Sequence, residues 1–205
     1  MIIFLQNLML MNGLPLYGNG HIWGLLSNYN PDVIHSAELY RGVSPARYGN
    51  RAGGGVVDIT TKGGNAEKWK GSINMDLATV GIALDGPLDD QGKLTAALGY
   101  RRSYLDLLLT SMAPELNESL IGNIHDINLK VNYKKSKEEH WNLWVYNGRD
   151  KYGLNFQSNI TDSLGRSVDL DIGLGWRWQN TLMGVNYFRE INKSHFMHAS
   201  IGITR

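Results

Sequence analysis

Residues 30–64, NPDVIHSAELYRGVSPARYGNRAGGGVVDITTKGG, decide how the rest of the chain is interpreted. Two apolar runs within this stretch, 33–41 and 56–61, predict two short strands. The connection between them, 42–55, contains a proline and repeated glycines and predicts a turn. A phosphate-cradling loop is excluded, because such a loop has a helix after its glycines and here a strand follows. Two short strands cannot bury a core alone, so this stretch belongs to a larger structure.

The composition favours β-structure with many turns. The 205 residues are enough for one or two domains. They include 24 glycines, 10 tyrosines and 6 tryptophans. The formal net charge is +1, and no basic patch indicates nucleic-acid binding. No apolar run reaches the roughly 18 to 20 residues of a membrane helix.

After residue 64 the chain divides into segments of about ten residues in which apolar and polar residues alternate. This pattern is typical of transmembrane β-barrel strands, with apolar residues toward lipid and polar residues toward the lumen. The expected strands are 69–78, 80–88, 93–109, 126–134, 141–147, 168–178 and a last strand that includes 197–203. Residues 110–122 and 150–166 are expected to form long loops.

The apolar set changes phase between residues 178 and 183. Trp176 and Trp178 are even-numbered members of the first set, whereas Met183 and Val185 are odd-numbered members of the second. A slip of one residue exchanges the two faces of a strand, so a bulge or a tight turn is expected near residues 179–181.

Charged residues are predicted to lie opposite the apolar rows, as a lipid-facing surface requires, because Lys or Arg at mid-membrane costs about 2–4 kcal/mol. A soluble sandwich with one solvated face would show the same separation, so this alternative stays open. Aromatic residues near the predicted strand ends favour the membrane, where they would form interfacial girdles. The charged residues are Asp76, Asp85, Arg101, Asp126, Lys130, Asp169, Asp171 and Arg177. The aromatic residues are Trp69, Tyr104, Tyr133, Trp141, Trp178 and Tyr187.

No arrangement of residues predicts catalysis, a metal or a cofactor. The six histidines fall in different predicted elements, and no nucleophile arrangement accompanies them. Asp89 and Asp90 lack the rest of a calcium-binding loop and are interpreted as turn residues. The sequence therefore predicts a protein that is not an enzyme.

The order of small motifs in the opening stretch resembles the end of the plug domain of TonB-dependent outer-membrane receptors. The residues that carry this resemblance are Glu38, Arg41, Gly42, Tyr48, Gly49, Gly54, Gly55, Val56, Ile59, Thr61 and Lys62. Residues 12–15 match the end of an earlier plug strand, and 86–88 with 101–106 resemble the first barrel hairpin. The segment RGVSPARYG differs from the usual SusC pattern, which favours a Bacteroidetes-type receptor outside that branch.

The resemblance implies a mainly β fold: the C-terminal part of a plug domain in residues 1–67, then in 68–205 six or seven antiparallel strands of an incomplete transmembrane β-barrel. Receptors of this family have about 22 strands and a plugged lumen. The start of the chain is a poor signal peptide, so we expect a fragment of a longer outer-membrane protein.

The implied function is uptake of a scarce nutrient, a siderophore, cobalamin, glycan or peptide, by ligand binding and plug movement driven by the TonB complex. The expected partners are outer-membrane lipid, the TonB complex and an unidentified ligand, with no nucleic acid. Glu38 and Arg41 of the plug and Arg101 of the wall are expected to join the two parts by ion pairs, which can break and reform when hydrated. The alternative is a soluble β-rich binding or adhesion module without a transport role.

Overall fold

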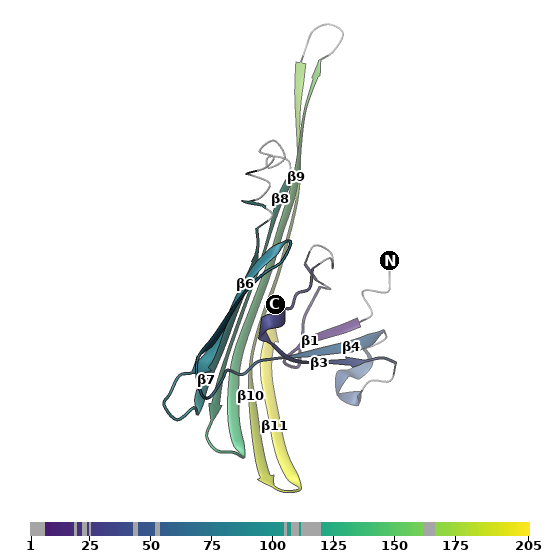
Figure 1. Cartoon of the computed structure of the whole chain (residues 1–205). Helices are drawn as coiled ribbons and strands as arrows, with labels where there is room; N and C mark the ends of the chain where they lie inside the picture. The colour runs from purple at the N-terminus through teal and green to yellow at the C-terminus, as the bar shows by residue number, and fades with distance from the viewer. Residues whose placement is uncertain are drawn as a thin grey trace.

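The computed structural model describes residues 7–18, 20, 21, 24, 26–42, 45–51, 54–104, 106, 107, 111, 120–161 and 167–205. Two sheets account for most of this part of the chain. A small sheet lies beside a tall, curved sheet, and its strands run across those of the tall sheet (Figure 1). No helix in the described ranges is long and apolar enough to cross a membrane.

The small sheet has the strand order β2-β1-β4-β3. Its strands are β1 (Asn7–Met11), β2 (Leu14–Pro15), β3 (Ile34–Tyr40) and β4 (Gly55–Thr61). β4 pairs in parallel with β1 and antiparallel with β3. Two short 3-10 segments, η3 (Pro31–Val33) and η4 (Ala46–Arg51), flank β3. The two strands predicted in the opening stretch are confirmed to within about a residue at each end.

The turn between β1 and β2 shows how local sequence shapes the small sheet. Asn12 and Gly13 both have positive φ, 50° and 84°, as a two-residue hairpin turn requires. The Asn12 side chain also joins this turn to the end of β4, because its Oδ1 accepts a hydrogen bond from the Thr61 backbone N–H at 2.9 Å. One residue therefore serves both as turn former and as a link between strands.

The tall sheet is an antiparallel meander in which each strand pairs with its neighbours along the chain. Its seven strands confirm the prediction of six or seven. They are β5 (Lys70–Met75), β6 (Thr79–Pro87), β7 (Leu94–Ser103), β8 (Leu120–Lys134), β9 (Glu139–Thr161), β10 (Ser167–Asn192) and β11 (His195–Thr204). The far ends of β9 and β10 rise above the rest of the sheet (Figure 1).

The two faces of the tall sheet differ sharply. One cross-strand row on the outer face is apolar over six strands: Leu84, Leu98, Leu129, Val145, Met183 and Ile203. These side chains are exposed or half-buried. The inner face packs on the small sheet, where Trp144, Tyr146 and Leu182 meet Met11 and Ile59 in one apolar cluster. An outer face of this kind is suited to lipid.

Three sequence-based expectations are wrong. Residues 150–161 belong to β9 and not to a loop, and 120–122 belong to β8; residues 112–119 and 162–166 lie outside the described ranges. No bulge or turn interrupts β10 near 179–181, because its pairing with β9 is unbroken from Ser167 to Arg189. The polar, glycine-containing sequence of upper β9 suggested a loop. Regular pairing with β10 keeps this segment extended instead.

The unbroken register corrects the predicted faces of β10. Trp176 and Trp178 lie on the same inner face as Leu182, while Asp169, Asp171 and Arg177 share the outer face with Met183. These three outward charges of β10 all lie above the level of the apolar row at Met183. There the outer surface meets water and not hydrocarbon, so charge on it costs little. Arg101, Asp126 and Lys130 lie on the inner face, as predicted, and are buried.

Candidate functional site

The segment between β2 and η3 brings a buried histidine against the wall of the tall sheet. His21 is only 3% exposed, and its backbone pairs with Leu26 in an isolated bridge. Gly20 makes this tight path available: it has φ +146°, and a Cβ atom there would lie 2.5 Å from the carbonyl oxygen of Leu26. Only glycine fits such a position.

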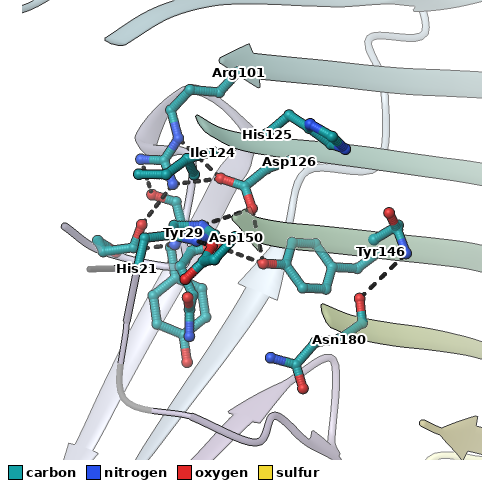
Figure 2. A network of polar contacts seen from close by, with 12 residues as sticks. His21, Tyr29, Arg101, Ile124, His125, Asp126, Tyr146, Asp150 and Asn180 are labelled. Carbon is teal, nitrogen blue, oxygen red and sulfur yellow. Dashed lines mark hydrogen bonds and ion pairs between the residues drawn. The ribbon is translucent and has the colours of Figure 1, made fainter. Parts of the chain in front are cut away.

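Two aspartates of the wall hold the His21 ring. Nε2 donates to Oδ1 of Asp126 on β8 at 2.8 Å, and Nδ1 donates to Oδ1 of Asp150 on β9. Both aspartates are buried and point into the network shown in Figure 2. Because each ring nitrogen faces a carboxylate oxygen, both nitrogens carry a proton and the ring is a cation.

Arg101 of β7 completes the network from the other side. Its Nε donates to Oδ2 of Asp126 at 3.0 Å, and its Nη1 and Nη2 donate to the backbone carbonyls of Tyr29 at 3.2 Å and Ser27 at 2.5 Å. Tyr146 donates its hydroxyl to the other oxygen of Asp126 at 2.9 Å. Asp126 thus accepts hydrogen bonds from three side chains (Figure 2).

The charges of the buried network cancel. His21 and Arg101 are the cations, and Asp126 and Asp150 are the anions. Burial by itself lowers the pKa of His21, but hydrogen bonds and charge from the two aspartates outweigh it and raise the pKa to about 9. Breaking such a buried set by removing one member leaves an uncompensated charge and costs about 3–5 kcal/mol.

Other contacts between the tall sheet and residues 7–63, the N-terminal unit, share one feature. In each, a side chain of the tall sheet donates a hydrogen bond to a main-chain carbonyl of the N-terminal unit. Asn180 donates to Tyr17, Lys130 to Thr61 at 2.9 Å, and Thr95 to Gly63 at 2.7 Å. Such contacts depend on the path of the backbone and not on which side chains the N-terminal unit carries.

Of the three residues expected to join plug and wall, Arg101 makes hydrogen bonds across the interface, and Glu38 lines a cavity between the small sheet and the tall sheet. Glu38 accepts a hydrogen bond from the hydroxyl of Tyr40 on its own strand at 2.5 Å. Arg41 follows β3 and is exposed. Within the described residues no ion pair links either one to Arg101. That Glu38 and Arg41 hold the plug against the wall stays a prediction.

The other residues of the opening motif shape the small sheet. Gly42, Gly49 and Gly55 have φ of 77°, 64° and 145°, which explains why glycine occupies these positions. Tyr48 donates to Oδ2 of Asp58 at 3.0 Å, and Lys62 donates to the carbonyl of Asp32 at 2.6 Å.

The burial of the remaining motif residues varies. Val56 and Thr61 are buried, whereas Gly54 is exposed. Gly53, part of the same glycine run, lies outside the described residues.

Sequence reasoning missed His21, Asp150 and Tyr146 as interface residues. His21 and Asp150 are 129 positions apart, so no local spacing relates them. The alternation did place Asp126 on the same face as Arg101, and this was the available signal. Asp150 was assigned to a loop and was therefore given no face.

Comparisons with known proteins agree with this architecture. Residues 5–56 match the family model of the TonB-dependent receptor plug domain. Over 42 residues, 20% of this chain and 6% of the relative, the sequence is 55% identical to the ferrienterobactin receptor of Escherichia coli (strain K12).

The fold is also similar to solved structures. For the siderophore receptor PirA from Acinetobacter baumannii, the TM-score is 0.52 at 17% identity, over 96% of this chain and 39% of that one. For the ferripyoverdine receptor of the outer membrane of Pseudomonas aeruginosa, the TM-score is 0.57 at 13% identity, over 89% and 25%. The chain therefore spans less than half the length of the relatives it matches.

A small sheet packed against the inner face of a curved antiparallel sheet with an apolar outer face is the arrangement of a plug and part of its barrel in an outer-membrane protein. Within this class, the match to the plug-domain model and the local identity to the ferrienterobactin receptor both point to the TonB-dependent receptors. Residues 5–56 match the plug domain of TonB-dependent receptors, and in this chain plug strands are followed by seven antiparallel strands like those of the barrel wall.

Proposed function

We propose that the complete receptor takes up an iron–siderophore complex, and that the TonB complex drives uptake by moving the plug. In this proposal residues 1–67 are the C-terminal part of the plug and 68–205 are barrel wall. The local identity to a ferrienterobactin receptor favours a siderophore over cobalamin, a glycan or a peptide. The role is transport and not catalysis.

The observation that carries the proposal is the set of polar contacts between plug and wall, which lie beside the apolar cluster of Met11, Ile59 and Trp144. One charge-balanced cluster and several hydrogen bonds to main-chain carbonyls hold the plug. Hydrogen bonds exchanged for bonds to water contribute only about 0.5–1.5 kcal/mol each between neutral groups and about 1.5–3 kcal/mol each when one group is charged. A pulling partner can therefore break them in turn, and water that enters compensates the charges left behind.

A disulfide between plug and wall tests plug movement. An ideal Cβ at Gly99 of β7 lies 3.5 Å from the Cβ of Val33 in η3, within the range that a disulfide spans. The chain has no cysteine, so the pair Val33→Cys and Gly99→Cys has no competing thiol within it. We expect the oxidised receptor to bind ferric siderophore but not take it up, and a reducing agent to restore uptake.

The single variant Val33→Cys is the matched control, and it should transport under oxidising conditions. Normal uptake by a receptor shown to be fully crosslinked would disprove plug movement at this interface. The same cells, supplied with labelled cobalamin, glycan or peptide, test the ligand. Uptake of one of these in place of ferric siderophore would disprove the ligand class but not the mechanism.

The soluble binding or adhesion module lacks a specific observation in its favour. Leu98, Leu129 and Met183 would face water in such a module, in the middle of an apolar row that crosses six strands. Monomeric soluble proteins rarely expose apolar patches of this extent.

A further inference from the structure

The outer face of the wall carries a cavity of about 490 Å³ near the upper end of β7, β8 and β9. The cavity is lined by Arg102, Asp106, Asn123, His125, Arg149 and Lys151, with Tyr100 at its lower side. It is separate from the plug contact, because these residues alternate with the inward-facing ones. His125, for example, follows Ile124 and precedes the buried Asp126, and its ring is turned away from the network (Figure 2).

Strand register assembles the basic side chains into two rows. Arg102, His125 and Arg149 are direct cross-strand neighbours on β7, β8 and β9. In the next row up, Lys151 of β9 lies between Asn123 of β8 and Arg177 of β10. The pairing is regular in this region, so all of these side chains project from the same face as the apolar row at Leu129.

The height of these rows on the barrel matches a membrane interface. A cross-strand aromatic row of Tyr133, Trp141 and Tyr187 marks the lower edge of the apolar outer face. The ring centroids of Trp141 and Tyr187 are 4.2 Å apart. Lys151 follows Trp141 by ten positions on β9. At roughly 3.3 Å per residue and a tilt of 35–45°, that is roughly 25 Å along the membrane normal. This equals the height of the apolar band of such barrels, so the Lys151 row lies at the outer headgroups. The Arg149 row lies two residues below it, close enough for a long side chain to reach the headgroups.

The cations of the cavity outnumber its described anions. Arg102 donates to Oδ2 of Asp106 at 2.9 Å, and Asn123 donates to the same oxygen at 3.3 Å. Arg149 and Lys151 add two further positive charges, and the Nε atoms of Arg102 and Arg149 are buried without a hydrogen-bond partner among the described residues. Arginine pairs well with phosphate because its planar guanidinium donates two parallel hydrogen bonds.

We propose that this outer-face cavity binds a phosphate-bearing headgroup of a lipid in the outer leaflet. The headgroup phosphate accepts hydrogen bonds from Arg102, Arg149 and Lys151. The acyl chains extend down the face below, over Tyr100, Leu98 and Leu129, which are exposed in this structure. This continuity between a basic cavity and an apolar surface favours a lipid over a free phosphate ion.

The test uses the full-length receptor in a non-ionic detergent, with lipid binding measured by native mass spectrometry. The probe is a diphosphorylated glycolipid of the lipid A type, compared with its dephosphorylated form. We expect binding to weaken about tenfold or more when the phosphates are absent, and also in the double variant Arg149→Gln, Lys151→Gln. Arg189→Gln is the matched control, because Arg189 also lies on the outer face of β10 but at the opposite border.

The single variant Lys151→Gln is a second test that does not depend on whether the double variant folds. Lys151 is exposed, so its replacement should leave the fold intact, and it should weaken lipid binding in the same direction. Three outcomes would overturn the proposal: equal binding of the two lipid forms, equal weakening by Arg189→Gln, or displacement of the lipid by millimolar inorganic phosphate. The last result would assign the cavity to a free ion.

Discussion

At the scale of single residues, His21 gives the clearest link between chemistry and structure. A histidine with both ring nitrogens on buried carboxylates has only one suitable charge state, the cation. It neutralises two aspartates that belong to different strands. Arg101 balances the remaining charge and also holds two carbonyls of the plug. A few side chains thus decide how the plug is seated.

Replacing His21 with alanine should destabilise the plug in its barrel. Asp126 and Asp150 would stay buried with one cation in place of two, and we expect a loss of about 3–5 kcal/mol. The measurement is thermal or denaturant unfolding of the full-length receptor. His195→Ala is the control, since His195 is exposed beside the β10–β11 turn and should change stability little. An equal effect of both variants would contradict the buried-cluster account.

The same residue predicts how stability depends on pH. The pKa of His21 is raised to about 9, above the ordinary 6.5, so its stabilising contribution is complete below about pH 6.5 and is lost as pH rises through 9. A shift of this size corresponds to about 3 kcal/mol.

Unfolding measured between pH 6 and 10 should show this loss in the wild type and a flatter profile in His21→Ala. A wild-type profile that rises through this range, or that His21→Ala leaves unchanged, would contradict the assignment.

At the scale of elements, β10 shows how one strand crosses two environments. Its lower half places Met183 and Val185 outward, toward lipid, and its upper half places Asp171 and Arg177 outward, toward water. The apolar residues of the upper half face inward. The change of phase in the sequence therefore marks the border of the membrane and not a defect in the strand.

A charge placed at two heights on the outer face tests this border. Leu129→Arg puts a cation near the middle of the apolar band, and we expect destabilisation of about 2–4 kcal/mol. Asp171→Arg puts the same side chain on the outer face above the band, where the expected change is small. Stability is measured by reversible unfolding in lipid vesicles. Similar costs at both positions would show that the border is misplaced.

At the scale of the whole molecule, much of the fold could be predicted. The alternation of residues predicted the strands of the tall sheet, and the glycine-rich stretch predicted β3 and β4. The predicted loop failed over 150–161 because upper β9 is polar and contains Gly153, and its pairing with β10, and with β8 as far as Leu154, keeps it extended. The plug contact was predicted only through Arg101, because the partners of that residue come from segments distant in the sequence.

Local periodicity and turn chemistry were determined by the amino-acid sequence alone. Each side chain of a strand points opposite to the next, and residues such as Asn12, Gly13 and Gly55 set the turns whatever surrounds them. Only the tertiary structure decided which charges meet and which face of β10 lies outward. Ion pairs and strand register depend on pairing between segments up to 129 residues apart, and no local pattern encodes such a pairing.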